Sequence, residues 1–496
     1  MTVIPDRGVA AGGIPPGGFL AAEMTTWRSR PATRAAISRG VPETLSDKGD
    51  IEVIRTKDRP WDLPGRCAGH GRRIGLRRAC WVFVVATAVA LAGCGESSQP
   101  AAPAKTASIS VGPDAPDVDK FLDAYWARPL TPQGRPPANS NAIDISLEPG
   151  SCGTCHAAQF DAWRGSLHAA AMSPGLLGQL AEMDAGARDE HQDCIRCHAP
   201  LAEQADSLAA ALASGRGLAE TPPGKAKPSH QHGMSCAACH VRGYEWYGPA
   251  RRDGSAPADR AGFPHGGWTA SRAFEDSRFC AACHQFQPDQ YALNGKLLEN
   301  TYEEWKASRY AREGKTCQSC HMPDRRHLWR GIHDPETTRA GVTIDAVTPT
   351  TDSGRVLAAL SIRNSGTGHQ FPTYVTPKVI VEGVQETARG KILPGSLQQV
   401  FIERRVKPDL SAELSDTRLA PDQSVTFNYR AALAPGARTL VLRVRVEPDA
   451  FYTELYRDLL ASGSARKGRR LIRNALDDSI ASQYTLFESR YPLPGP

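Results

Sequence analysis

The sequence of 496 residues predicts an α+β protein in which a region of helices and loops precedes a β-sandwich-like region and a C-terminal helix. Two observations lead to this fold class. Ten of the thirteen cysteines fall between residues 152 and 320, among short helical patterns and loops rich in Gly and Pro. From about residue 340, cysteine disappears and short runs of alternating apolar and polar residues begin, as is typical of strands.

Residues 1–93 are predicted to be a leader. The basic stretch RRIGLRR (72–78) precedes a short apolar run, ACWVFVVATAVALAGC, which ends at Cys94. This order is typical of a secretory signal peptide, and the run is shorter than the about 20 residues that span a membrane as a helix. Because signal peptides usually have about 15–30 residues, we expect the true translation start to lie downstream of Met1.

The end of the leader resembles the lipobox of bacterial lipoproteins, Leu91-Ala92-Gly93-Cys94. The resemblance implies that Cys94 is lipidated, and that the chain is an exported, periplasmic or outer-membrane lipoprotein of a bacterium. An uncleaved signal anchor is the alternative. Residues 94–117 are rich in Pro, Ala and Ser, which predicts a flexible tether between the lipid and the folded part.

The net charge of +6 belongs to the leader. Residues 1–93 hold fourteen Lys and Arg against eight Asp and Glu, so the remainder of the chain is balanced. Proteins that bind nucleic acid carry a basic face, and we therefore expect no nucleic-acid partner.

The segment 118–335 carries five copies of Cys-x-x-Cys-His. A single copy would fit a zinc site, a thiol–disulfide pair or a haem attachment site. The repeated histidine decides between them, because haem c needs two thiols for the porphyrin vinyl groups and an adjacent imidazole for the iron. The predicted thioether residues are Cys152 and Cys155, Cys194 and Cys197, Cys236 and Cys239, Cys280 and Cys283, and Cys317 and Cys320. The predicted proximal ligands are His156, His198, His240, His284 and His321.

The remaining cysteines leave no donor for another framework. Cys67 and Cys80 lie in the leader and Cys94 is the lipid site, so the mature chain has no thiol outside the motifs. A zinc finger or a disulfide framework would not repeat the histidine. We therefore predict five covalently bound haem c groups.

Each iron takes up to one more axial ligand. Methionine is scarce in the mature chain, so a second histidine is the expected sixth ligand. His191, His230 and His232 are weaker candidates because they lie in a helix-end position or alternate in His-Gln-His. Gly366 and Gly368 are expected to form a tight turn that presents the histidine of NSGTGHQFPT. The predicted distal ligands are His168, His265, His327, His333 and His369.

The segment 336–496 is predicted to be a β-sandwich-like domain with a closing helix. In TLVLRVRV, the apolar residues Leu440, Leu442, Val444 and Val446 alternate with polar positions, and VLAALSIRN, KVIVEGV, QVFIERRV and SVTFNYR are similar. Near the end of the chain, apolar residues recur at roughly helical spacing, at Ile472, Leu476, Ile480, Tyr484 and Phe487. This pattern predicts the closing helix.

Residues 145–375 resemble the cytochrome c-554 family of multihaem proteins. The resemblance is carried by CGTCHAAQFDAWRGSLHAAAM, DCIRCH, GMSCAACH and RFCAACHQF, in that order. TYEEWKASRYAREGKTCQSCHMP and GHQFPT are similar to segments of longer relatives, which add a haem and a C-terminal β-domain. The type protein has four haems, of which one lacks a sixth ligand, and this chain has five motifs. The type protein's partner and role therefore do not transfer directly.

Electron transfer is the function that we expect first. Five haems attached within about 170 residues must lie close together, and a lipid anchor would hold them at a membrane. Expected partners are redox proteins: a quinol oxidase, other cytochromes or a terminal reductase. The alternative is a reductase or oxidase of a small nitrogen or sulfur compound at one five-coordinate haem. A structural role in a larger complex is the third possibility.

Overall fold

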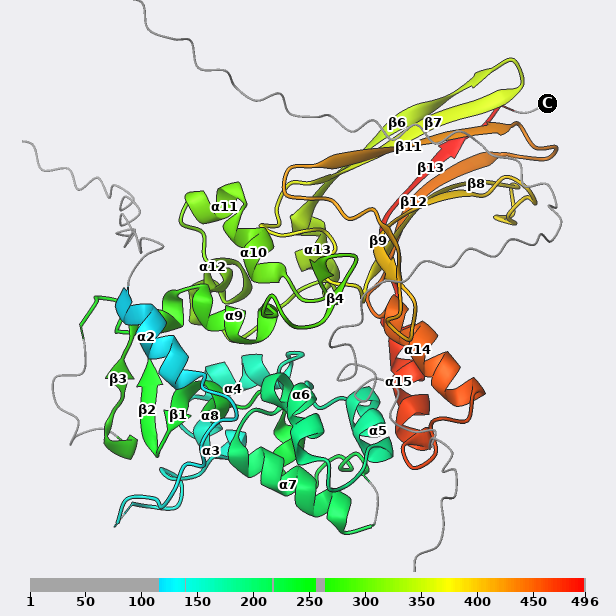
Figure 1. Ribbon diagram of the computed structural model, residues 1–496. Coiled ribbons are helices and arrows are strands. Elements are labelled where there is room, and N and C mark those ends of the chain that lie inside the picture. The colour runs from blue at the N-terminus through cyan, green and yellow to red at the C-terminus, as the bar shows by residue number, and fades with distance from the viewer. Residues whose placement is uncertain (1–115, 139, 216–217, 256–263, 495–496) are drawn as a thin grey trace, which may run out of the picture. The chain divides into compact units, whose positions relative to one another are not determined.

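The computed structural model describes residues 116–494 except 139, 216–217 and 256–263 (Figure 1). The predicted leader, Cys94 and nearly all of the predicted tether lie outside these residues. Residues 116 and 117 belong to the first described helix, α2 (Pro116–Tyr125). All the described residues lie in one compact unit of the chain.

The region that carries the motifs is built from short helices joined by long loops. Its helices after α2 are α3 (Pro149–Gly153), α4 (Ala157–Arg164), α5 (Pro174–Glu182), α6 (Arg188–His198), α7 (Ala202–Ala213), α8 (Cys236–His240), α9 (Arg278–His284), α10 (Thr301–Lys306), α11 (Arg309–Arg312), α12 (Cys317–His321) and α13 (Pro335–Gly341). Four 3₁₀ turns lie between them: η1 (Ser229–His232), η2 (Pro264–Gly266), η3 (Arg272–Glu275) and η4 (Pro323–Arg325).

Four of the five motifs form the C-terminal end of a helix. The helices α6, α8, α9 and α12 each end on the histidine of their motif. Ser235 caps α8 and Thr316 caps α12, each accepting a hydrogen bond from a backbone N–H of the first turn. A helical Cys-x-x-Cys-His places the two sulfurs and the imidazole on neighbouring turns, so the local fold presents all three groups together.

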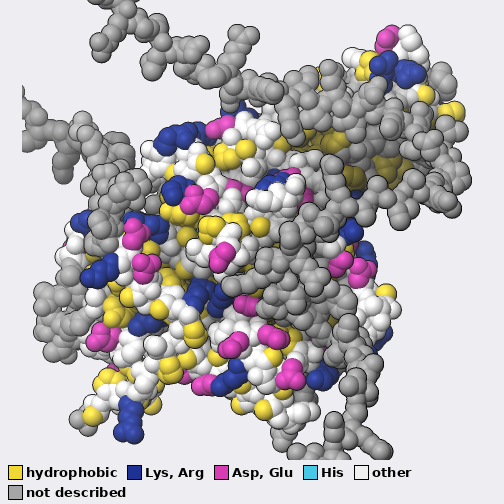
Figure 2. Space-filling model, in the orientation of Figure 1, with side chains coloured by type: hydrophobic (Ala, Val, Ile, Leu, Met, Phe, Trp, Pro, Cys, Tyr) yellow, Lys and Arg dark blue, Asp and Glu magenta, His cyan; other side chains and the backbone are white. Residues whose placement is uncertain are grey.

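Two small sheets complete the motif-bearing region. One contains β1 (Val241–Arg242), β2 (Glu245–Gly248) and β3 (Thr269–Ala270), and the other contains β4 (Ala292–Leu293) and β5 (Lys296–Leu297). On the face seen in Figure 2, basic and acidic side chains are interspersed over this region. The mixture agrees with the balanced charge of the chain beyond the leader.

Two antiparallel sheets form the region after Val342, and the predicted sandwich-like fold is confirmed. The larger sheet has the order β10-β9-β8-β12-β13 and the smaller has the order β11-β7-β6. Every predicted strand is present, and β6, β10 and β13 were not predicted. The strands are β6 (Val342–Asp352), β7 (Arg355–Asn364), β8 (Lys378–Glu386), β9 (Gln398–Val406), β10 (Glu413–Asp416), β11 (Ser424–Ala432), β12 (Thr439–Glu447) and β13 (Tyr484–Pro492).

The two sheets share one apolar core. Leu360 of β7 and Phe427 of β11 belong to the same buried cluster as Val381 of β8 and Leu442 of β12. The predicted inward residues of β12 are all fully buried, which alternation along a half-buried strand explains.

The C-terminal helix is confirmed, but it is shorter than its apolar pattern predicted. The helix α15 (Arg469–Ala481) ends before Tyr484 and Phe487, which lie in β13 instead. The backbone there pairs with β12, and the Tyr484 hydroxyl donates to the Ile332 carbonyl at 2.7 Å. This tertiary pairing overrides a spacing that fits a helix as well as a strand. A second helix, α14 (Ala450–Ala461), was not predicted.

The helix α15 packs closely against α5 of the motif-bearing region. The Glu182 carboxylate accepts hydrogen bonds from the backbone N–H groups of Arg466 and Gly468, at 2.6 and 2.7 Å. A Cβ atom at Gly468 would lie 2.2 Å from the carbonyl oxygen of Gly178, so only glycine permits this approach. The contact ties the C-terminal helices to the motif-bearing region.

Gly468→Ala is therefore expected to lower the free energy of unfolding by about 1–3 kcal/mol, because the added methyl group meets rigid backbone. Thermal unfolding followed by circular dichroism measures the change. Gly165→Ala is the matched control, since the nearest atom to its Cβ lies 3.8 Å away. Equal stability of the two variants would contradict the predicted packing.

Among the residues that the structure describes, no helix is both long and apolar enough to span a membrane.

Candidate haem sites

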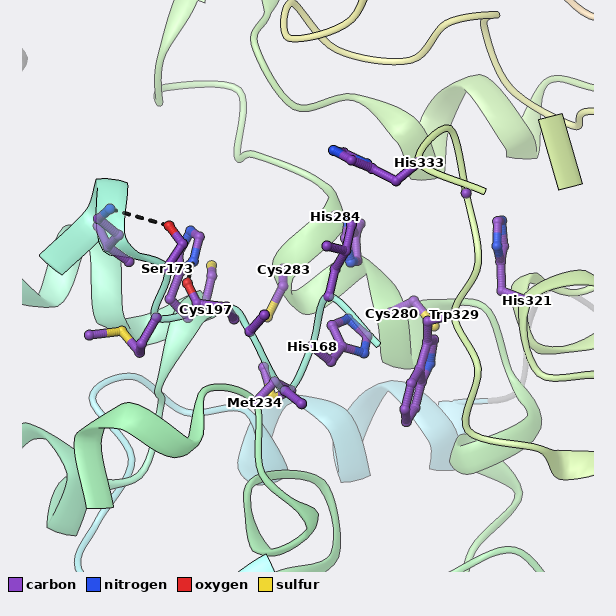
Figure 3. A pocket seen from close by; sticks show the side chains of 18 of the residues that line it. His168, Ser173, Cys197, Met234, Cys280, Cys283, His284, His321, Trp329 and His333 are labelled. Carbon is purple, nitrogen blue, oxygen red and sulfur yellow. Dashed lines mark hydrogen bonds between the residues drawn. The ribbon is translucent and has the colours of Figure 1, made fainter. Parts of the chain in front are cut away.

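One cavity of about 2270 Å³ lies in the motif-bearing region and brings all five motifs together. The cysteines and the histidine of every motif line it. Pockets for single small molecules measure about 300–1,000 Å³, so this space suits several large groups. Figure 3 shows part of its wall, where His168, Cys280, Cys283 and His284 lie around a common space.

The thiols of different motifs lie beside one another. The Cys152 thiol lies beside that of Cys236, so the first motif adjoins the third. The Cys197 thiol lies beside that of Cys283, so the second motif adjoins the fourth.

The fourth motif also contacts the fifth and lies near the third. The Cys280 thiol lies beside that of Cys317 and near that of Cys239. The spatial order of the motifs is therefore first, third and fourth, with the second and fifth both adjacent to the fourth.

The thiols and imidazoles have the chemistry that covalent haem needs. All ten motif cysteines are free thiols. Burial lowers the pKa of His284 to about 4, and it also lowers the pKa of His240. Neutral imidazole is the form that binds iron, so these side chains are ready ligands at neutral pH.

Backbone carbonyls orient three of the proximal histidines. The Nδ1 atom of His198 lies 2.7 Å from the Ala171 carbonyl oxygen, that of His240 lies 2.8 Å from Tyr247, and that of His321 lies 2.8 Å from Arg330. A hydrogen bond at Nδ1 sets the tautomer and leaves Nε2 free for a metal.

Three of the predicted distal histidines face a proximal histidine across the cavity. The ring centroids are 6.2 Å apart for His168 and His284, 6.1 Å for His327 and His240, and 6.4 Å for His369 and His321. Two imidazoles on opposite sides of an iron, with metal–nitrogen bonds of about 2.0–2.1 Å as for zinc, have centroids roughly 6 Å apart. These pairs therefore fit an iron between them.

His265 lines the cavity without facing a motif histidine. Its Nδ1 lies 2.9 Å from the Gly267 carbonyl oxygen, and its ring stacks on Trp246 with centroids 4.7 Å apart. His327 and His369 have the same local arrangement, with Nδ1 within 3.0 Å of a carbonyl one or two residues away. His265 remains a predicted distal ligand.

His333 is placed differently from the other candidates. Its Nε2 lies 2.9 Å from a carboxylate oxygen of Asp449, so this nitrogen is not directed at a motif histidine.

Among the described residues, neither His156 nor His198 has a second imidazole opposite it at the separation of the three pairs. The described residues therefore show an opposing imidazole for the third, fourth and fifth motifs only.

The weaker candidates lie outside the cavity wall. His191 and His230 are 2% exposed, and the Nδ1 atom of His230 lies 2.9 Å from the Ser207 hydroxyl. His232 lies 2.5 Å from the Glu148 carboxylate through Nε2.

The glycines beside His369 act by their small size. Neither Gly366 nor Gly368 has a positive φ, so the expected tight turn is not formed by left-handed glycines. A Cβ atom at Gly366 would lie 2.2 Å from the Ala340 carbonyl oxygen. The segment can therefore approach the motif-bearing region closely, which is what brings His369 opposite His321.

Two residues of the site carried no signal in the sequence. The Trp329 ring lies 4.6 Å from that of His168 and 5.0 Å from that of His327, between two distal candidates. The Arg128 guanidinium donates to the Cys197 and Cys283 sulfurs, at 3.3 and 3.2 Å. Both residues depend on contacts between distant segments, and no short motif marks them.

Ten thiols, five motif histidines and paired imidazoles around one cavity are the side chains with which a multihaem c-type cytochrome holds covalently bound haem c. Residues 151–241 match the family described as cytochrome c554 and c-prime. The predicted resemblance to this family is confirmed.

A solved structure has the same fold. The penta-heme cytochrome c552 from Thermochromatium tepidum is 19% identical, and the alignment covers 71% of this chain and 100% of that one with a TM-score of 0.50. No curated protein sequence matches the chain.

Proposed function

We propose that the chain carries five haem c groups and transfers electrons between redox proteins. The proposal depends mainly on the contiguous order of the motifs around one cavity, in which thiols of neighbouring motifs lie close together. Haem supplies one-electron chemistry at its iron, and the protein controls ligation, burial and spacing. The side chains of this cavity hold five attachment points within a single apolar space, so that each group has a neighbour.

The fourth motif has the central position in this arrangement. Its thiols contact those of the second and fifth motifs, and the third motif lies nearby through Cys239. An electron that enters at the first motif would therefore pass the third and fourth before it reaches either the second or the fifth. This branched path gives two possible exits.

Export and lipidation at Cys94 would hold this electron carrier in the periplasm or at the outer membrane. A quinol oxidase, another cytochrome or a terminal reductase would be the partner, as part of a respiratory chain. Labelling with a radioactive fatty acid tests the anchor, and Cys94→Ser should abolish the label.

The second candidate function is the binding and conversion of a small nitrogen or sulfur compound. One observation favours it: His198 faces no second imidazole among the described residues, which would leave an open position at the second motif. Cys194 and Cys197 of this motif lie on the cavity wall with Tyr374 and Tyr452.

Electron paramagnetic resonance spectra of the oxidised protein, before and after nitrite or hydroxylamine is added, separate the two functions. Only low-spin haem and no change on addition would support the carrier alone. A high-spin signal that shifts with the added compound would support the second candidate. Failure of the reduced protein to pass electrons to any cytochrome would contradict the first.

A further inference from the structure

A buried carboxyl group lies at the edge of the second motif and has no part in haem attachment. Glu299, between β5 and α10, lines the cavity, and its carboxylate accepts a hydrogen bond from the Thr301 N–H at 3.3 Å. Its backbone is held by Phe286, whose N–H donates to the Glu299 carbonyl at 2.9 Å. The side chain therefore has a defined place beside the haem space.

The surroundings of Glu299 make it sensitive to charge. It interacts electrostatically with Cys197 of α6 and Glu304 of α10, and with Tyr374 of the loop before β8. Burial is the main reason that the pKa of Glu299 rises to about 8, and the nearby Glu304 carboxylate raises it further. The Arg128 guanidinium donates to the sulfur of Cys197, which adjoins Glu299.

Hydroxyl and carboxyl groups connect Glu299 with a second carboxylate. The Thr301 side chain lies beside the Glu299 carboxylate, and its Oγ1 lies 2.7 Å from that of Thr373. The Thr373 hydroxyl in turn donates to Glu304 Oε2 at 3.3 Å. Each of these groups can accept and pass on a proton, so the chain is continuous from the cavity to Glu304.

An ion-pair network continues from Glu304 to the surface. Arg418 lies 3.2 Å from Glu304 and 2.9 Å from Asp416, and Lys296 lies 2.6 Å from Asp416. The Lys296 side chain is 39% exposed. These charged groups fix Glu304 in place at the boundary between the cavity and solvent.

We propose that Glu299 takes up a proton when the haem attached at Cys194 and Cys197 is reduced. The inference rests on the proposed electron-transfer function. The ferric iron gains one electron from the donor protein, and the Glu299 carboxylate gains one proton from solvent through Glu304, Thr373 and Thr301. Reduction removes one positive charge beside the carboxylate, which favours its protonated form.

The experiment is a spectroelectrochemical titration of the whole haem-loaded protein with dithionite at several pH values. One of the five one-electron components should fall in potential by up to about 59 mV per pH unit around pH 8. Below this window the carboxyl group is protonated in both redox states, and well above it the group is ionised in both, so the potential should be constant there.

Glu299→Gln should abolish this slope, and Glu299→Asp should retain it. Glu303→Gln is the matched control, because Glu303 is exposed, lies on the adjoining helix α10 and has no place in the chain to the cavity. A slope that persists unchanged in Glu299→Gln would overturn the proposal. Haem content from the visible spectrum shows whether each variant is correctly loaded.

Thr373→Val provides an independent test, because it removes the hydroxyl between Thr301 and Glu304. Proton uptake after rapid reduction, followed with a pH indicator, should slow at least tenfold, while the equilibrium slope is retained. Uptake as fast as in the unaltered protein would overturn the assigned path. A protein that reduces normally without any pH slope would leave electron transfer intact and disprove only the role of Glu299.

Discussion

Replacement of His369 by Gly is expected to convert one of the five haems of the oxidised protein from low spin to high spin. His369 is the described imidazole that faces His321, with centroids 6.4 Å apart. Burial lowers the pKa of His369 to about 4, so at neutral pH it is a neutral ligand. Its removal would leave the fifth motif's iron with one axial histidine.

Electron paramagnetic resonance measures this change directly, and added imidazole should restore the low-spin signal by filling the space. His333→Gly is the matched control, since His333 lies against Asp449 and faces no motif histidine. A low-spin spectrum in His369→Gly that equals the unaltered protein's would exclude His369 as a ligand. A high-spin signal in the His333→Gly variant would instead show that His333 is a distal ligand.

The same substitution is expected to weaken the link between the sheets and the motif-bearing region. His369 lies in the segment between β7 and β8, whereas His321 ends α12. An iron bound by both histidines would join the sheets to the motif-bearing region through coordinate bonds, in addition to the packing of α15 on α5. Limited proteolysis should therefore cut His369→Gly faster than the unaltered protein.

Replacement of His168 by Met is expected to raise the potential of the haem at the fourth motif. His168 faces His284 at 6.2 Å, and ligation by Met in place of His raises haem potentials. The rise should be on the order of 0.1 V or more, within the about 0.8 V range that axial ligands span. Potentiometric titration of the visible spectrum measures it.

The position of the fourth motif makes this substitution the most damaging to electron transfer. Because the second, third and fifth motifs all lie next to it, a high potential at this point would trap electrons instead of passing them on. Flash photolysis should show slower equilibration between the haems. His191→Met is the control for loss of a buried histidine, since His191 is buried and lies outside the cavity wall. Equal potentials in both variants would contradict the pairing.

The attachment residues could be predicted from sequence because each motif is local. Two cysteines and a histidine within five residues have nearly the same mutual geometry in any short helix, and α8 and α12 have this form. The strands followed from alternation for the same reason, since the period of two is a property of the backbone. Tyr484 and Phe487 show where this fails, because their spacing also fits a helix and only pairing with β12 decides.

The sequence by itself determined the covalent haem chemistry, the proximal ligands and the two-part fold class. The tertiary structure alone decided which distal histidines face which motifs, and that the fourth motif is central. It also placed Trp329 between two distal imidazoles and Glu299 beside Cys197. The physical reason is range: covalent attachment and strand periodicity act over a few residues, whereas these contacts join segments about 40 to 160 residues apart, whose meeting depends on the packing of the whole chain.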